Sequence, residues 1–342
     1  MKAVQVVSPN RLELIDVPKP SIDGTNNVLV RMTAAGICGS DVGIYHGTNA
    51  AATYPRIIGH EMVGVVEEVG EGVTTPKVGD RVIINQVTSC GHCYACRKGR
   101  GNVCDNLKVR GVHIDGGYRE YIAVPAGDCY LLPDGLSDVD AVMIEPTTIA
   151  IQVCARAELA GDDMLLIYGA GSLGFSILRI ARTMCEHIIV ADIMDDKLAE
   201  AKEAGAKFTI NSKTEDFYAK VREYTHGRGP TVSIDCAFLK TSMMTMLEVT
   251  GNAGRVMSLG FETDPIPVNP FLITSKELDL RGSRLQNKMF GKAIEMIREG
   301  TLDLTGSVSH TFPMINAQEA FDFVDSRDPS YRKAVLTFDW ER

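Results

Sequence analysis

Long apolar runs are absent from this 342-residue sequence, which limits the kinds of protein it can be. Although 45% of the residues are hydrophobic, no stretch approaches the ~20 consecutive apolar residues that a helix needs to cross a bilayer. The first residues, MKAVQVVSPN, also lack the sustained apolar core and small-residue cleavage site of a secretory signal. We therefore expect a cytoplasmic protein with no membrane partner.

Clusters of positive charge are lacking too. The chain has 35 Lys and Arg against 44 Asp and Glu, a formal net charge of −9, and no basic stripe that could follow a phosphate backbone. Nucleic acid is therefore not expected as a partner. Internal repeats and low-complexity segments are also missing, and the length suggests two globular domains at about 150 residues each.

Cysteine is concentrated in the stretch CGHCYACRKGRGNVC, which contains Cys90, Cys93, Cys96 and Cys104. Four thiolates in the spacing C-x2-C-x2-C-x7-C can form a tetrahedron around one ion, so we predict a structural zinc site. A bacterial ferredoxin run has three residues before its fourth cysteine and a proline after it. Here seven intervene and Asp105 follows, which favours zinc over an iron–sulfur cluster. Disulfides would require an oxidising compartment.

The spacing of apolar residues along the sequence changes near the middle of the chain. Up to about residue 150, short alternating runs broken by Gly and Pro are typical of an antiparallel, barrel-like β domain. After residue 160 the order is strand, glycine turn and helix, with buried strands expected at 164–168 and 188–191 around a helix at 175–181. That order indicates a parallel βαβ unit.

Further strands are predicted at 207–210, 232–237, 255–259 and 278–280, so the doubly wound half should end near residue 281. A helix around 291–299 follows, and the segments 310–312 and 334–338 could rejoin the first sheet. We therefore predict a catalytic domain formed by residues 1–150 and 282–342. The cofactor domain, residues 151–281, would be an insertion.

A glycine-rich turn, GAGSLG, lies between the first predicted strand and helix of that insertion. Gly169, Gly171 and Gly174 fit G-x-G-x-x-G, with Ser172 and Leu173 between them. In this setting the first glycine makes a tight turn, the second admits a pyrophosphate, and the third lets helix and strand pack closely. The turn predicts a dinucleotide site.

Asp192 ends the next predicted strand, 23 residues after Gly169. A carboxylate there can accept hydrogen bonds from the adenosine ribose and would repel a 2′-phosphate. The expected cofactor is therefore NAD, in preference to NADP.

A second metal site is indicated by Cys38, in GICGSD, and by His60 and Glu61, in GHE. His60 lies 22 residues after Cys38. Both segments are short glycine-flanked turns. A thiolate, an imidazole and a carboxylate would leave zinc an exchangeable position, which is typical of a catalytic site. We therefore expect two zinc ions per chain.

Taken together, these residues resemble the medium-chain, zinc-dependent alcohol dehydrogenase superfamily. The motifs GICGSD, GHE, the four-cysteine lobe, DGGYREY and GAGSLG occur in that family's order across essentially the whole chain. The resemblance implies a GroES-like β-barrel catalytic domain with an inserted doubly wound, parallel-sheet Rossmann domain. It also implies hydride transfer from a secondary alcohol to NAD, and a homodimer or homotetramer.

Ile144-Glu145-Pro146 resembles the branch that acts on polyols, sugar acids and sugar-alcohol phosphates, such as sorbitol, L-idonate, L-galactonate and galactitol-phosphate dehydrogenases. Threonine dehydrogenases are similar but usually carry aspartate where Glu145 stands. The resemblance makes Glu145 either the fourth zinc ligand or the group that holds zinc's water. It also makes Arg284 a residue that faces the substrate.

Ser40 is the expected first carrier of the alcohol's proton, because its hydroxyl both accepts and donates hydrogen bonds. Related alcohol dehydrogenases end this relay with a histidine where this chain has Gly43, so His46 or water on Glu145 would have to replace it. Two rivals from other functional classes are a non-catalytic NAD-binding sensor or scaffold and a zinc-ribbon interaction module.

Overall fold

The computed structural model describes residues 1–25, 27–260, 264–326, 328 and 330–338. The chain divides into two units, one formed by Met1–Pro146 with Phe290–Arg342 and the other by Thr147–Met289. Residues 147–150 and 282–289 thus fall in the second unit, whereas the sequence pattern predicts them in the first. Residues 147–150 lie inside one continuous helix, and residues 283–289 form neither helix nor strand. Neither boundary therefore coincides with a change in the apolar pattern of the sequence.

The first unit is built mainly from strands. These are β1 (Lys2–Ser8), β2 (Arg11–Asp16), β3 (Val28–Gly36), β4 (Arg56–Ile57), β5 (Glu61–Val69), β6 (Arg81–Ile84), β7 (Val87–Thr88), β8 (Lys108–Val109), β9 (Tyr121–Val124), β10 (Cys129–Leu131), β17 (His310–Pro313) and β18 (Ala334–Thr337).

The largest sheet of this unit has the order β10-β6-β5-β3-β18-β17, and β9 also pairs with β3. Its pairings are antiparallel except for β17 with β18, which are parallel. A smaller sheet has the order β2-β1-β4, and β7 pairs with β8. The C-terminal strand β18 lies beside β3, as predicted, so the chain does return to its first sheet after the insertion.

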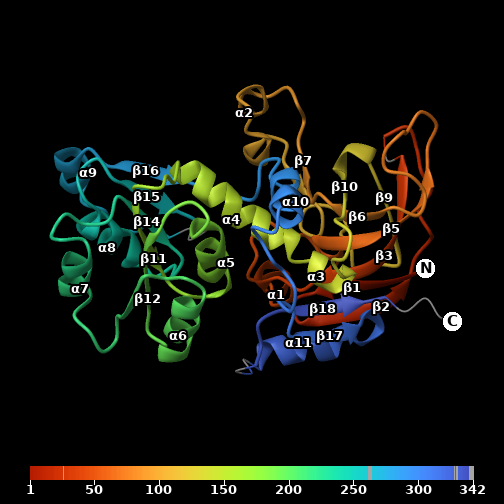
Figure 1. The fold of residues 1–342 in the computed structure, drawn as a ribbon. Coiled ribbons are helices and arrows are strands. Elements are labelled where there is room, and N and C mark those ends of the chain that lie inside the picture. The colour runs from red at the N-terminus through yellow and green to blue at the C-terminus, as the bar shows by residue number, and fades with distance from the viewer. Residues whose placement is uncertain (26, 261–263, 327, 329, 339–342) are drawn as a thin grey trace. The chain divides into compact units, whose positions relative to one another are not determined.

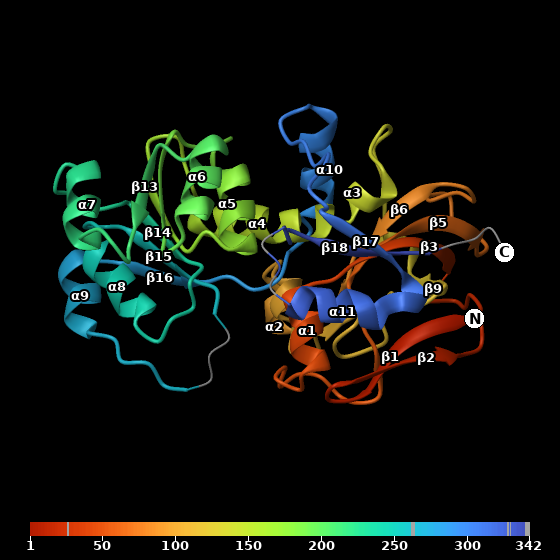
Figure 2. The same ribbon diagram turned by 90° about the horizontal axis from the view of Figure 1, so that it is seen from below.

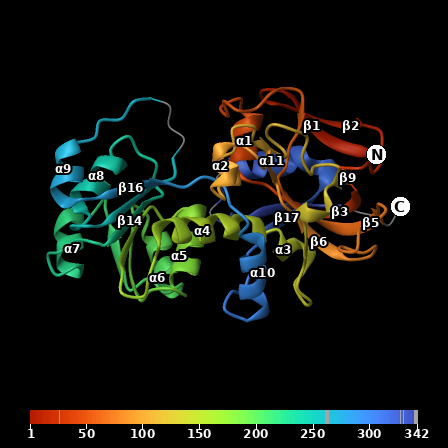
Figure 3. The ribbon, with the colours of Figure 1, turned by 90° about the horizontal axis from the view of Figure 1, so that it is seen from above.

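Short helices flank these sheets. They are α1 (Gly39–Tyr45), α2 (Tyr94–Arg97), α3 (Asp138–Ala141), α10 (Phe290–Arg298) and α11 (Ala317–Asp325), with 3-10 turns η1 (Gly101–Val103), η2 (Ala126–Asp128) and η3 (Met314–Asn316). Helix α11 lies along β17 and β18 (Figures 2 and 3). Helix α4 (Ile144–Ala157) begins in this unit and continues the chain into the second.

The second unit is a doubly wound parallel sheet in the order β13-β12-β11-β14-β15-β16, with each neighbouring pair parallel. Its strands are β11 (Met164–Tyr168), β12 (His187–Asp192), β13 (Phe208–Asn211), β14 (Val232–Asp235), β15 (Arg255–Ser258) and β16 (Asp279–Gly282). Its helices after α4 are α5 (Ser172–Ala181), α6 (Asp195–Glu203), α7 (Phe217–Tyr224), α8 (Ser242–Val249) and α9 (Pro270–Lys276).

Helices α5 and α6 lie on one face of this sheet, and α7, α8 and α9 on the other (Figures 1 and 2). Strand β11 is almost wholly apolar because both of its faces are covered. The parallel sheet with helices on both faces confirms the predicted doubly wound unit. Among the described residues, no helix combines the length and the apolar character that crossing a membrane requires.

Candidate active site

Three different kinds of metal ligand meet in the first unit. Cys38 is the N-cap of α1, His60 immediately precedes β5, and Glu61 is the first residue of β5. One ligand atom from each of the three lies within 4.8 Å of the other two. His60 and Glu61 are only 7% and 1% exposed, and Cys38 is half-buried. The structure thus brings together the three side chains that the motifs singled out.

Close packing behind His60 explains the glycine of GHE. Gly59 has a φ of +91°, and a Cβ atom there would lie 2.2 Å from the ring of Tyr118. Tyr118 comes from the DGGYREY segment, is fully buried, and donates a hydrogen bond of 2.9 Å to the carbonyl of Gly36. The segment that carries Tyr118 therefore supports the turn that presents His60.

Asp41 is a buried carboxylate that holds the backbone at Cys38 and next to His60, and sequence reasoning missed it. It accepts hydrogen bonds from the backbone N–H of Cys38 at 2.9 Å and of Gly59 at 3.2 Å. Its Oδ1 lies 3.3 Å from Nδ1 of His60. Burial opposes ionisation, but His60 and the Cys38 N–H keep the pKa of Asp41 below its usual value. Its position in the first turn of α1 was the available signal.

Lys333 is a second residue that the sequence did not reveal. Its Nζ donates to Oε1 of Glu61 at 2.6 Å, across 272 residues of sequence, and the side chain is 9% exposed. Burial lowers the pKa of this ammonium, but Glu61 and Cys38 together raise it above its ordinary value. Lys333 therefore stays charged and compensates part of the negative charge at the site.

Glu145 and Gln86 form a buried pair. Glu145, the second residue of α4, is 3% exposed, and the fully buried Gln86 donates its amide Nε2 to Oε1 of Glu145. Burial, with Glu61 adding to it, raises the pKa of Glu145 to about 7. The amide oxygen of Gln86 is buried and has no hydrogen-bond partner among the described residues. The described residues therefore leave one buried acceptor beside Glu145 unpaired.

The charge balance at the three clustered side chains suits a cation. Burial alone would lower the pKa of His60, yet the neighbouring Asp41 and Cys38 raise it well above its ordinary value. Positive charge is thus favoured at that imidazole. A thiolate, an imidazole and a carboxylate within 4.8 Å of one another are the ligand types that zinc accepts. The residues present therefore fit a zinc ion.

Ser40 lies next to this cluster, with its Oγ 3.5 Å from Nε2 of His60. His46 is engaged elsewhere, because its Nδ1 contacts Oδ1 of Asn10 at 2.8 Å and its Nε2 contacts Oδ1 of Asp325 at 3.0 Å. A proton-relay role for His46 would require those surface contacts to break. Ser40 is the better placed of the two.

The four-cysteine lobe also forms a compact cluster. The sulfurs of Cys90, Cys93, Cys96 and Cys104 lie within 4.8 Å of one another, and all are free thiols in the structure. Backbone N–H groups point at them, for example Cys90 N at 3.2 Å from the sulfur of Cys104. The N–H groups of His92 and Cys93 lower the pKa of Cys90 to about 6, which favours the thiolate that a metal needs.

The glycine-rich turn in the second unit has the space that a dinucleotide requires. Gly169 has a φ of +108°, and a Cβ on Gly174 would lie 1.9 Å from the carbonyl oxygen of Gly169, so strand and helix touch there. A Cβ on Gly171 would have no neighbour within 4 Å, which leaves the backbone approachable. Gly171 caps α5, whose first residues are Ser172 and Leu173.

Asp192 ends β12 beside this turn. Its Oδ2 accepts from the backbone N–H of Ala170 at 2.7 Å, and its Oδ1 accepts from the N–H groups of Ile193 and Met194. The carboxylate is therefore held in place next to the turn. Arg284 is exposed in the second unit, two residues after β16 ends.

Comparison with known sequences gives matches along most of the chain. Residues 24–134 match the alcohol dehydrogenase GroES-like domain family, and residues 172–299 match the zinc-binding dehydrogenase family. The starvation-sensing protein RspB of Escherichia coli K12 is 38% identical over 342 residues, covering 99% of both chains. An L-threonine 3-dehydrogenase of Anaeromyxobacter dehalogenans is 32% identical, over 95% of this chain and 94% of that protein.

Solved structures agree with these matches. The rspB alcohol dehydrogenase of Escherichia coli CFT073 in complex with NADH superposes with a TM-score of 0.92 at 38% identity, over 99% of both chains. L-idonate 5-dehydrogenase of Escherichia coli K-12 superposes with a TM-score of 0.87 at 26% identity, over 98% of both chains. The chain therefore belongs to the medium-chain, zinc-dependent alcohol dehydrogenase superfamily and is an oxidoreductase of that family.

Proposed function

We propose that this protein is a zinc-dependent dehydrogenase that oxidises a secondary alcohol of a polyhydroxy substrate with NAD. The observation that carries this proposal is the clustering of Cys38, His60 and Glu61, whose ligand atoms lie within 4.8 Å of one another. Zinc held there would act as a Lewis acid that stabilises negative charge developing on the alcohol oxygen, and the nicotinamide would accept the hydride.

The protein's own residues position this chemistry. Asp41 fixes the turn of Cys38 and the imidazole of His60 through the contacts described above. Lys333 holds the carboxylate of Glu61. Ser40, which has its hydroxyl 3.5 Å from the imidazole of His60, would carry the proton away from the alcohol.

Glu145 would act either as a fourth ligand or as the group that holds water at the metal. Its contact with Gln86 fixes one carboxylate oxygen. The cysteines at 90, 93, 96 and 104 would hold a second, structural zinc ion, which has no open position for substrate.

NAD is the proposed cofactor, in preference to NADP. The open approach at Gly171 supports a pyrophosphate there, and Asp192 is held beside the turn where the adenosine ribose would lie. The exposed apolar side chains of Ile193 and Met194 follow it, and neither supplies the positive charge that a 2′-phosphate would need.

A polyhydroxy alcohol is the proposed substrate class. The buried amide oxygen of Gln86, which has no partner among the described residues, could accept a hydrogen bond from a second hydroxyl group. Likeness to L-idonate 5-dehydrogenase, at 26% identity, points the same way. In this proposal Arg284 would face the substrate, where a guanidinium suits hydroxyl and carboxylate groups.

Two other functions have specific support. Relatives named L-threonine 3-dehydrogenase, at 32% identity, favour an amino alcohol, whose ammonium could also donate to Gln86. The relative named as a starvation-sensing protein, at 38% identity, favours a sensor that binds NAD without turnover.

The test is a substrate panel of polyols, aldonates, sugar phosphates and threonine, assayed for NADH absorbance with zinc-replete protein. We expect NADH to form with a polyol or sugar acid, and more slowly with NADP. Turnover of threonine alone would contradict a polyhydroxy substrate and favour an amino alcohol instead. Tight NADH binding with no turnover on any alcohol would support the sensor instead.

A further inference from the structure

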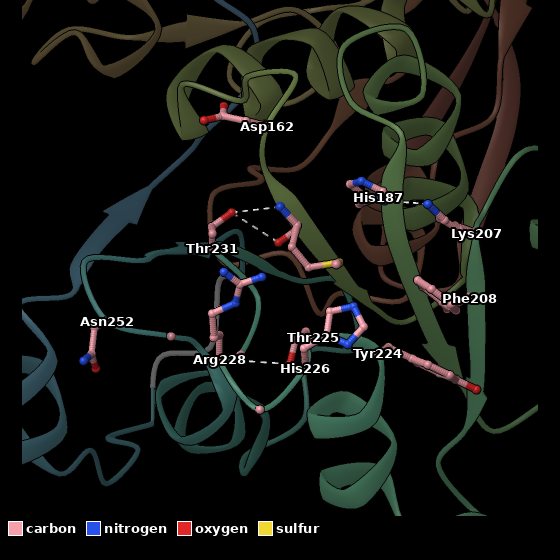
Figure 4. Close-up of a pocket in the computed structure, with 14 residues that line it drawn as sticks. Asp162, His187, Lys207, Phe208, Tyr224, Thr225, His226, Arg228, Thr231 and Asn252 are labelled. Carbon is pink, nitrogen blue, oxygen red and sulfur yellow. Dashed lines mark hydrogen bonds between the residues drawn. The ribbon is translucent and has the colours of Figure 1, made fainter.

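A pocket lies in the second unit at the end of the sheet away from the glycine-rich turn (Figure 4). Its volume is about 810 Å³. It is lined at the amino ends of neighbouring strands, by Met164, His187 and Phe208, which begin β11, β12 and β13, and by Thr231, which precedes β14. The dinucleotide turn follows the carboxyl end of β11, at Tyr168. The pocket is thus a separate site on the same strands.

The polar lining of the pocket is mainly basic. Lys207, Arg228, His187 and His226 line it, against one carboxylate, that of Asp162, among its described lining residues. The ammonium of Lys207 donates to Nδ1 of His187 at 2.8 Å. Neither Lys207 nor Arg228 forms an ion pair in the part of the chain that the structure describes. Two uncompensated cations around one pocket, in a chain of net charge −9, make it attractive to anions.

The loop that carries Arg228 and His226 is fixed by its own contacts. The hydroxyl of Thr225, a buried residue at the end of α7, accepts from the N–H of Gly229 at 3.0 Å. A Cβ on Gly229 would lie 2.3 Å from the carbonyl oxygen of Val249, so the loop is packed tightly against the following segment. The two basic side chains are therefore presented from a preorganised backbone.

The hydroxyl of Thr231, which lines the pocket, already has partners within the protein. Thr231 donates to Oδ1 of Asp163 at 2.6 Å and accepts from the N–H of Met164 at 3.0 Å. Asp163 is in turn paired with Arg255. Because Asp163 is engaged there, it does not neutralise the cations that line the pocket.

An aromatic wall adjoins the cations. The rings of Phe208 and Tyr224 stack with centroids 4.4 Å apart and planes inclined by 13°, and both line the pocket. In Figure 4 this pair lies on the same side as Lys207, whereas Arg228 comes from the loop after α7. The pocket thus combines a forked donor, an apolar surface and a second positive group.

We propose that this pocket binds a small molecule with two anionic groups, at least one of them a phosphate. Arg228 would hold the phosphate with its guanidinium fork, and the carbon body would lie on the ring pair of Phe208 and Tyr224. Lys207 attracts the second anionic group. Ligand binding here is independent of the alcohol oxidation proposed above.

The experiment titrates the full-length protein by calorimetry in a phosphate-free buffer, with NADH at saturation so that the dinucleotide turn is occupied. The probes are inorganic phosphate, glycerol phosphate and a sugar bisphosphate. The variants are Arg228→Gln and Lys207→Gln, and Lys202→Gln removes an exposed charge from α6 as the matched control. Circular dichroism and melting temperature verify that each variant is folded.

We expect saturable binding at one site per chain, with the bisphosphate about tenfold or more tighter than glycerol phosphate, since a second charge-assisted contact forms. Arg228→Gln should weaken all three probes about tenfold or more, and Lys207→Gln should remove the advantage of the bisphosphate. Absence of saturable binding in the presence of NADH, no preference for the bisphosphate, or equal affinities in Arg228→Gln and Lys202→Gln would overturn the proposal.

Discussion

Glu61 is a buried carboxylate with a buried ammonium, Lys333, 2.6 Å away. Because removing one partner of a buried ion pair leaves the other charge unpaired, Lys333→Met should lower the free energy of unfolding of metal-free protein by about 3 kcal/mol. Zinc should recover part of that loss, since Glu61 then has another cation. Urea unfolding with and without zinc measures both values.

Lys19→Met is the control for that comparison, because Lys19 pairs with Glu67 at the surface, at 3.6 Å. Its loss should cost less than about 1 kcal/mol. A Lys333→Met protein as stable as wild type would argue against a stabilising pair between Lys333 and Glu61. A zinc-induced gain in the free energy of unfolding that is no larger in Lys333→Met than in wild type would argue against an ion held by Glu61.

Asp192 allows a second test with single residues. Removing a carboxylate that bonds the ribose should cost about 1.5–3 kcal/mol, so Asp192→Ala should weaken NAD about 10-fold to 100-fold and NADP much less. The dissociation constants of NADH and NADPH, measured by fluorescence titration, check this. Asp192→Asn is the matched variant, because it keeps an acceptor for the N–H of Ala170. Equal weakening of both cofactors would remove Asp192 from cofactor selection.

Some residues of the site could be predicted from the sequence and others could not. Cys38, His60 and Glu61 could be found because their residue types are metal ligands and their glycine-flanked turns are distinctive. Lys333 and Gln86 could not, because their partners lie 272 and 59 residues away. In sequence, a lysine after an arginine and a glutamine after an asparagine resemble ordinary surface residues.

At the scale of elements, strands buried on both faces were the easiest to predict. The apolar run at 164–168 coincides with β11 to the residue, because covered parallel strands have continuous apolar sequences. The strand predicted at 278–280 is instead β16, Asp279–Gly282, which is partly exposed at the sheet edge and so carries a weaker pattern. The parallel pairing of β17 with β18 was not anticipated, since it depends on contacts between distant segments.

The turn between β11 and α5 gives a prediction at this scale. Gly174→Ala places a Cβ 1.9 Å from the carbonyl of Gly169, so it should destabilise the protein by about 1–3 kcal/mol. Gly171→Ala places its Cβ in open space and should change stability by less than about 0.5 kcal/mol. It should nevertheless weaken NADH about tenfold, since it obstructs the pyrophosphate.

Thermal unfolding and NADH titration of both variants separate the two roles. If Gly171→Ala bound NADH as tightly as wild type, the pyrophosphate would have to lie elsewhere. If Gly174→Ala melted like wild type, strand and helix would not be in contact through that residue.

At the scale of the whole molecule, the two rhythms of the sequence predicted an insertion, and the return of β18 to β3 confirms that the chain rejoins its first sheet. The boundaries of the insertion were harder to predict, because α4 runs unbroken across residues 144–157 and residues 283–289 have no regular structure. Family membership could be predicted because the motifs that carry it are distributed along the whole chain. Substrate choice depends on loops whose side chains carry no comparable pattern.

The most direct test of the account is zinc content, measured by mass spectrometry on replete protein, together with alcohol-dependent NADH formation. We predict about two zinc ions per chain in wild type. Cys38→Ser should retain about one, lose turnover and remain folded, whereas Cys93→Ser should lose the other ion and be destabilised more. Full turnover in Cys38→Ser, or wild-type zinc content in that variant, would contradict the proposed catalytic site.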